Sequence, residues 1–426
     1  MGFSQALSGL NAASKNLDVM GNNIANAQTV GYKSASMQFA DVYAGAKVGL
    51  GVSVAGVQQN FNDGNLEATG RNLDLAISGG GFLRFDQGEQ IVYARNGQLT
   101  MTPDGFLVNA QGGRLTGYPG AAGNGGQLQQ LNISAAGLPA KATEELKATL
   151  NLDATMALLD PAAFDPLKPA TYSYANGATV FDSQGTPQTL TMYFIKTGIN
   201  TWEVRTARAT PEGQEFSALS TRLNFDANGL LQSSTQLTAV ETTVVNPDGT
   251  TSVVTTVTPG ATIAPYEATN VGFALTAGAN DLNFKLNLAG STQFANEFEL
   301  GSLNQDGYTS GSLTGITVDK KGQIIGNYSN ERTQVLGTIA MANFRNPEGL
   351  QPVGGGWVES SDSGQALIGE AGAGLFGTIE SGVIETSNVE LTKELVALII
   401  AQRNFQANAQ TIKLQDEVLQ QAVNLR

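Results

Sequence analysis

Both ends of this 426-residue chain carry a narrow apolar stripe, and the segment between them has no comparable helical pattern. Large apolar residues recur at alternating spacings of about four and three, which is the pattern of one face of an α-helix. At the N-terminus these residues are Phe3, Leu7, Leu10, Leu17 and Ile24. At the C-terminus they are Leu391, Leu395, Leu398, Phe405, Ala409, Ile412, Leu419 and Val423. Such a chain brings its distant ends together or joins them to other copies of itself.

The stripes predict one helix over residues 3–24, ending before Gly31, and a longer one over 388–426. Ser387 followed by Glu390 fits a capping box, with Ser387 as the N-cap and Glu390 at the third helical position. Two positions of the C-terminal stripe, Gln402 and Asp416, are polar and would fix register if buried. Periodicity alone leaves open whether the helices pair within one chain or form an intermolecular bundle.

The interior reads as β-structure. Gly accounts for 51 residues and charged residues for only 14% of the chain, so its polarity comes mainly from Thr, Ser, Asn and Gln. Turn tetrapeptides with Pro second and Gly fourth occur at 102–105, 246–249 and 346–349. β-Branched runs flank the second turn and predict a hairpin there. We therefore expect a multidomain fold, with terminal α-helices in a coiled-coil-like bundle and nested all-β domains of antiparallel sheets or barrels between them.

Changes in composition divide the chain into four zones. Three of them are built from two separate segments, and the fourth is a single insert. The helical zone is 1–30 with 385–426, and an extended Gly-rich linker is 31–70 with 359–384. One β domain is 71–150 with 289–358, and a second is 151–288. The simplest topology is nested, so that the chain passes through the first β domain, builds the second and returns.

Charge and missing residue types exclude several functions. The net charge is −14, residues 1–33 carry +1 and residues 385–426 carry −1, so the interior carries the whole excess. Nucleic acid is not an expected partner at this charge. Without Cys or His, Cys/His metal sites and catalysis through either residue are excluded. The N-terminus does not resemble a cleaved signal peptide, and no apolar run is long enough to span a membrane.

Candidate catalytic motifs are weak. The run Ser78–Phe82 lacks the Lys and the helix of a phosphate loop and is expected to be a strand-end turn. Residues 51–55 approach a nucleophile elbow but end in Ala55. A glycan hydrolase using two carboxylates is the alternative from another class, poorly supported by two Trp residues. No calcium-loop pattern occurs. We expect no enzyme, no cofactor and no metal.

Nine short blocks, in order along the chain, resemble the bacterial flagellar rod and hook family. They are Asn22–Lys33, Leu73–Phe82, Tyr93–Leu99, Gly105–Asn109, Gly326–Asn330, Leu336–Gly337, Asn346–Leu350, Ser387–Leu391 and Gln402–Ala409. Glu331 departs from the pattern, because Gly is common there. The motif positions carried over are Asn26, Thr29, Gly31, Tyr32, Lys33, Asn346, Pro347, Gly349, Leu350, Ser387, Asn388, Gln402, Arg403, Gln406, Ala407 and Asn408.

The resemblance implies a subunit of a hollow helical tube, exported without a cleaved signal peptide through the flagellar type III apparatus to the outside of the cell. The large insert 151–288 favours the hook over the shorter rod proteins, with the distal rod protein as the alternative. The terminal helices would form the inner layer, 71–150 with 289–358 the middle layer and 151–288 the outer layer. Implied partners are other copies of the chain, the distal rod protein, the hook–filament junction protein and the hook cap. Neither nucleic acid nor a membrane is implied.

Overall fold

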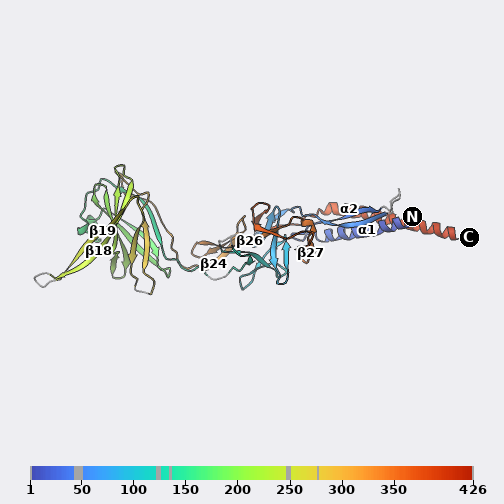
Figure 1. Cartoon of the computed structure of the whole chain (residues 1–426), viewed down its shortest axis with the longest axis horizontal. Coiled ribbons are helices and arrows are strands. Elements are labelled where there is room, and N and C mark those ends of the chain that lie inside the picture. The colour runs from blue at the N-terminus through green and yellow to red at the C-terminus, as the bar shows by residue number, and fades with distance from the viewer. Residues whose placement is uncertain are drawn as a thin grey trace. The chain divides into compact units, whose positions relative to one another are not determined.

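The chain folds into two compact units (Figure 1). The computed structural model describes residues 2–42, 51–120, 126–133, 137–245, 251–275 and 278–424. The first unit comprises Met1–Ala136 with Leu313–Arg426, and the second comprises Gly137–Ser312. The second unit is wider than the expected 151–288, because strands β12 (Glu145–Asp153), β22 (Thr292–Phe294) and β23 (Glu299–Gln305) pair inside it.

Two helices form the terminal part of the first unit, α1 (Gly2–Ala25) and α2 (Leu391–Asn424), which confirms the expected helical ends. The predicted capping box is wrong. Glu390 occupies the N-cap place, because its carbonyl accepts the first helical hydrogen bond from the amide of Glu394 at 3.0 Å. Ser387 instead accepts a bond from the amide of Val389, only two residues on, in a turn before the helix.

The expected linker is largely ordered strand. Strands β1 (Ala35–Val42) and β2 (Gly51–Gln59) form an antiparallel pair with a bulge at Gln38–Phe39. Near the C-terminus, three strands pair with strands elsewhere in the first unit. They are β29 (Leu367–Glu370) with β26 (Thr333–Asn343), β30 (Thr378–Ser381) with β4 (Asp74–Ser78), and β31 (Val383–Glu385) with β3 (Leu66–Ala68). The segment 359–384 therefore belongs to the sheets of the first unit, because its strands pair with β26 from the C-terminal half of the chain and with β4 and β3 from the N-terminal half.

The β-body of the first unit interleaves strands from both halves of the chain. Its main sheet runs β24-β25-β26-β10-β5-β6-β28-β27, a second runs β30-β4-β7, and β3 pairs with β31. A core of Leu, Ile and Val side chains fills it, together with an aromatic cluster around Phe82, Phe344 and Trp357. Its remaining strands are β5 (Phe82–Asp86), β6 (Ile91–Ala94), β7 (Gly97–Gln98), β8 (Thr100–Met101), β9 (Leu107–Val108), β10 (Arg114–Pro119), β11 (Gln129–Gln130), β24 (Leu313–Val318), β25 (Gln323–Tyr328), β27 (Gln351–Val353) and β28 (Gly356–Val358).

The second unit packs two sheets around one core that contains Trp202, Phe194 and Phe284. One sheet runs β13-β14-β15-β17-β18-β19, and the other runs β20-β21-β12-β22 with β23 also on β12. The pairings are antiparallel as expected, except that β12 runs parallel to β21 and β22. The strands not yet bounded are β13 (Tyr174–Phe181), β14 (Pro187–Gly198), β15 (Thr201–Thr210), β16 (Gly213–Phe216), β17 (Leu219–Phe225), β18 (Leu231–Val245), β19 (Thr251–Ile263), β20 (Thr269–Phe273) and β21 (Leu282–Asn287).

Most of the expected turns lie where the sequence placed them. Gly105 closes its turn onto the carbonyl of Thr102 at φ 85°, and the run Ser78–Phe82 connects β4 to β5. The turn 246–249 lies outside the described residues, but β18 and β19 on either side of it pair antiparallel. Glu331, the departure from the family pattern, has φ 60°, which is a left-handed conformation that Gly adopts more easily.

Candidate assembly interface

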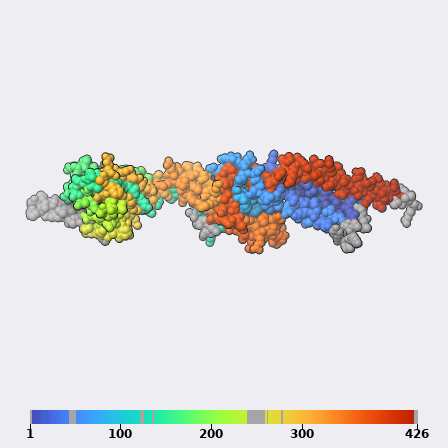
Figure 2. Space-filling view, turned by 90° about the horizontal axis from the view of Figure 1, so that it is seen from above, coloured from blue at the N-terminus to red at the C-terminus, as the bar shows by residue number. Residues whose placement is uncertain are grey.

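The two terminal helices pack against each other within one chain, running in opposite directions. The amide of Asn23 donates to Glu394 Oε1 at 3.3 Å near one end of the pair. Near the other end, a Cβ placed on Gly9 would lie 2.9 Å from Asn408 Nδ2. The residue numbers in both pairs add to 417, which makes the register antiparallel and places Gly2, the start of α1, opposite residue 415. The last turns of α2 therefore continue past α1, as Figures 1 and 2 both show.

Small residues are among the most buried ones on both helices. Ala6 and Ala12 of α1 and Ala401 of α2 are only 4–6% exposed, and Gly9 lies against Asn408. Residues without bulk allow the two backbones to approach closely. The α1-facing stripe of α2 is at least half-buried along its length and consists of Glu394, Leu398, Ala401, Phe405, Asn408, Ile412 and Gln415.

The predicted stripe residues divide into two groups. Leu10, Leu17, Ile24, Leu398, Phe405, Ala409 and Ile412 are partly buried. The others remain exposed in the single chain, namely Phe3 (47%), Leu7 (43%), Leu391 (43%), Leu395 (48%) and Leu419 (59%). The side chain of Val423 lies outside the described residues. Leu419 continues the α1-facing stripe two turns beyond Ile412 and is exposed because α1 has already begun opposite residue 415.

The two polar positions expected within the stripe are not buried. Gln402 and Asp416 are both exposed, and Asp416 accepts a hydrogen bond from Gln420 on its own helix. The polar side chains that do face α1 are those of Glu394, Asn408 and Gln415. Of the motif residues on α2, Asn408 contacts α1, whereas Gln402, Arg403, Gln406 and Ala407 point to solvent.

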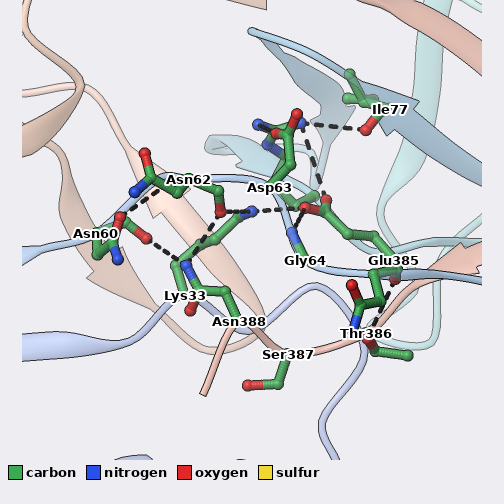
Figure 3. A network of polar contacts seen from close by, with 12 residues as sticks. Lys33, Asn60, Asn62, Asp63, Gly64, Ile77, Glu385, Thr386, Ser387 and Asn388 are labelled. Carbon is green, nitrogen blue, oxygen red and sulfur yellow. Dashed lines mark hydrogen bonds and ion pairs between the residues drawn. The ribbon is translucent and has the colours of Figure 1, made fainter. Parts of the chain in front are cut away.

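A buried polar network joins the helices to the β-body (Figure 3). The Lys33 ammonium donates to Glu385 Oε1 at 2.6 Å and to the carbonyl of Asn62 at 2.7 Å. The side chains of this ion pair are 1% and 0% exposed. Arg95 lies 3.8 Å from the other oxygen of Glu385 and 3.0 Å from Asp63. Burial, followed by the charge of Arg95, lowers the pKa of Lys33, and the contact with Glu385 opposes that shift.

The family-like motifs 22–33 and 387–391 build the surroundings of this network. Gly31 has φ 71°, its amide donates to the carbonyl of Glu385, and a Cβ there would lie 2.6 Å from the amide of Asn96. Asn388 accepts from the amide of Ser34 and donates to the carbonyls of Asn60 and Asn62. Each motif thus provides hydrogen bonds that hold an N-terminal segment of the chain against a C-terminal one.

The remaining motif residues close local turns. Asn26 bonds back to Asn22, and Thr29 donates to Asn26, which turns the chain after α1. Tyr32 donates to Asn23, and burial, followed by Glu394, raises its pKa. In the block 346–350, Pro347 and Gly349 lie in a short 3₁₀ turn (Pro347–Gly349), Asn346 donates to the carbonyl of Asp362, and Leu350 joins the aromatic cluster around Trp357.

Helix α2 carries a second line of exposed apolar residues that was not predicted from the sequence. Val396, Ile400, Leu414 and Val418 are 54–64% exposed and lie off the stripe that faces α1. The sequence pattern that could have predicted this line is two apolar pairs, each with a spacing of four, repeated 18 residues apart. Because 18 residues make five full helical turns, the two pairs lie on the same side of the helix. Among the described residues, no helix is long and apolar enough to cross a membrane, and no group of three or more His, Cys, Asp or Glu side chains is placed to hold a metal ion.

Four family models match separate segments of the chain. Family models match residues 4–33 (flagella basal body rod protein), 76–145 (flagellar hook protein FlgE/F/G D1 domain), 151–308 (flagellar basal body protein FlaE D2 domain) and 380–425 (flagellar basal body rod FlgEFG protein, C-terminal).

Relatives and a solved structure agree with these models. The flagellar hook protein FlgE of Escherichia coli K12 is 42% identical, with 100% of both chains covered, and that of Borreliella burgdorferi is 32% identical over 99% of this chain and 98% of the relative. The fold is similar to the crystal structure of Helicobacter pylori flagellar hook protein FlgE2, with a TM-score of 0.51 at 12% identity, covering 75% of this chain and 100% of that one. This chain belongs to the flagellar hook protein family.

Proposed function

We propose that this chain is the structural subunit of a flagellar hook, which polymerises into a hollow, flexible tube that transmits torque as a universal joint and conducts exported subunits. The observation that carries the proposal is the apolar surface left exposed on a well-packed helix pair, from Phe3 and Leu7 on α1 to Leu395 and Leu419 on α2. Burying the exposed half of one such side chain stabilises an assembly by about 1 kcal/mol. Several of them together supply a driving force for association with other copies.

The nested chain path gives each part a place in the tube. We place the helix pair in the inner layer, the β-body of the first unit in the middle layer and residues 137–312 in the outer layer. The partners at the ends of such a tube would be the distal rod protein, the hook–filament junction protein and, during growth, the hook cap. The subunit would reach the cell exterior through the flagellar type III export apparatus, and a chain without Cys needs no disulfide reduction before export.

Electron microscopy of the purified, polymerised chain tests this function. A short curved tube is the expected result, whereas a straight tube would favour the distal rod protein. A monodisperse monomer with glycan hydrolase activity would overturn both.

A variant with a disrupted helix pair supplies the second arm. Leu398→Asp places a charge in the stripe that faces α1, and we expect it to abolish tube formation. Fluorescence from Trp202 and Trp357, buried in the second and first units respectively, should stay as in the parent chain. Tubes formed normally by Leu398→Asp would show that the helices are not the assembly element.

A further inference from the structure

Helix α2 leaves apolar side chains exposed near its two ends, with polar exposed side chains between them. We define the root cluster as Leu395, Val396, Ile399 and Ile400, and the tip cluster as Leu414, Val418 and Leu419, all of them 48–64% exposed. The intervening exposed residues include Gln402, Arg403, Gln406, Gln410 and Lys413. Two separated apolar clusters on one helix indicate two separate contacts rather than one continuous seam.

The two clusters share one line along the helix. Val396 and Ile400 are each followed by an apolar residue 18 positions on, Leu414 and Val418. Eighteen residues complete five turns and span about 27 Å, so both pairs point in the same direction. Neither pair can therefore cover the other within one copy, because α2 is a continuous helix between them.

The tip cluster continues an interface that already exists. Leu419 lies on the same stripe as Leu398, Phe405 and Ile412, which pack towards α1, but α1 begins opposite residue 415. The projecting end of α2 is thus apolar on the side where α1 would lie and also on the outer line of Val418. A partner that buries both Leu419 and Val418 has to contact two neighbouring faces of this projecting end. A helix that packed only along the line of Val418 would leave Leu419 exposed.

Resting on the proposed function, we propose that the tip cluster of one copy packs against the root cluster of the next copy, head to tail. The occupant of each cluster is a second copy of this chain. Because the two contacting patches differ, the contact does not close on itself, and repetition generates an open filament. If two α2 helices instead packed side by side, parallel and in register, Arg403 of one copy would lie beside Arg403 of the other. Each root cluster would then contact a root cluster, and each tip cluster a tip cluster.

Cysteine trapping tests the pairing cleanly, because the chain has no cysteine of its own. Each root position, Val396 or Ile400, is replaced by Cys together with a tip position, Leu414 or Val418, giving four double variants that cover small differences in register. All four positions are exposed, so the single chain keeps its fold. A disulfide within one copy is excluded by the helix between the two sites, since a disulfide joins Cα atoms less than about 7 Å apart.

Head-to-tail packing predicts a ladder of covalent multimers from at least one double variant after mild oxidation of the polymer. Single-Cys variants should give no dimer alone, and a mixture of root-Cys and tip-Cys chains should give dimers but no ladder. The matched control combines Ile400→Cys with Gln410→Cys, an exposed position in the polar stretch, and should remain uncrosslinked.

Other outcomes overturn the proposal in distinguishable ways. Dimers from a single-Cys variant would mean that like clusters pair, and double variants that stop at dimers would mean a closed antiparallel pair of α2 helices. Tubes without any crosslink would overturn the head-to-tail contact but leave the hook function standing. A ladder without tubes would support the head-to-tail contact but overturn the hook function. The absence of both tubes and crosslinks would overturn the contact and the hook function together.

Discussion

At the scale of single residues, the contact that most defines the first unit joins Lys33 to Glu385. These residues are 352 positions apart, and both side chains are essentially inaccessible to water. Such a pair forms only after the last segment of the chain has reached its place. Removal of one partner leaves an uncompensated buried charge, which is more damaging than the loss of a surface pair.

Glu385→Ala should therefore lower the free energy of unfolding of the first unit by about 3–5 kcal/mol. Guanidinium denaturation of chains that also carry Trp202→Phe, followed by the fluorescence of the remaining Trp357, measures the change. The matched control is Glu380→Ala, which removes an ion pair whose Lys320 side chain is 75% exposed, and should cost less than about 1 kcal/mol. Equal costs for the two variants would contradict a structural role for the buried network.

Tyr266 makes the stability of the second unit depend on alkaline pH. Its hydroxyl accepts from the amide of Leu288 at 2.6 Å, and burial raises its pKa to about 12. Between its ordinary pKa of 10.0 and about 12, the folded state keeps the proton and the unfolded state has lost it. This contribution is complete below pH 10 and is lost as the pH rises through 12.

Over that interval the free energy of unfolding should fall by about 2–3 kcal/mol more than in Tyr266→Phe, which cannot ionise. Urea denaturation in a Trp357→Phe background measures it, because the remaining Trp202 lies in the core of the second unit. Parallel pH profiles for the two chains would show that this hydroxyl is not linked to folding.

At the scale of elements, the packing of α1 against α2 depends on small residues at their contact. Gly9 and Gly21 both lie in α1, yet a side chain at Gly9 would meet Asn408, whereas Gly21 has nothing within 4 Å of a Cβ position. The same substitution should therefore have opposite effects at the two sites.

Gly9→Leu should weaken the pairing of α1 with α2 by about 1–3 kcal/mol through overpacking. Gly21→Leu should strengthen the helix by about 0.5–1 kcal/mol, because Gly is a poor helix former. Thermal melting of the helical circular dichroism signal, together with proteolysis at Arg403 and Lys413, measures both. A Gly9→Leu variant that is stabilised as much as Gly21→Leu would mean that the two helices do not meet at Gly9.

At the scale of the whole molecule, the second unit is an insertion whose two ends lie together. The backbones of Leu138 and Gly311 exchange hydrogen bonds of 2.7 and 3.0 Å, and Lys141 and Tyr308 do the same at 3.0 and 2.9 Å. The first unit has its own cores, around Leu83 and around Trp357. Each unit also holds one of the two Trp residues.

Deletion of residues 137–312, with a short Gly-Ser link in their place, should therefore leave the first unit folded. Trp357 should keep the emission of a buried indole, and the deleted chain should still form the cysteine ladder if assembly depends on the helices. Solvent-exposed emission from Trp357 would show that the first unit needs the second one in order to fold. A deletion variant with a longer flexible link is the control. If it folds where the short link fails, the failure is due to strain at the junction and not to a need for the second unit.

Much of this protein could be predicted from local pattern. The spacing of Leu398, Phe405 and Ile412 located a helix, because a helical period repeats within a few residues. The tetrapeptide ending in Gly105 located a turn for a similar reason. The start of α2 could not be read in the same way, because Ser387 was drawn into a turn beside Asn388, whose side chain bonds segments from the other end of the chain.

Local sequence pattern therefore suffices to predict the terminal helices, the β-rich interior and the resemblance to flagellar axial proteins. The contact of Gly9 with Asn408 of the partner helix, the exposure of Leu395 and the place of β12 in the second unit depend instead on tertiary contacts. So does the choice of Glu385 as the partner of Lys33. The reason is that periodicity and turn chemistry act between near neighbours in the chain, whereas the face that is buried and the charge that is paired depend on segments brought together from hundreds of residues away.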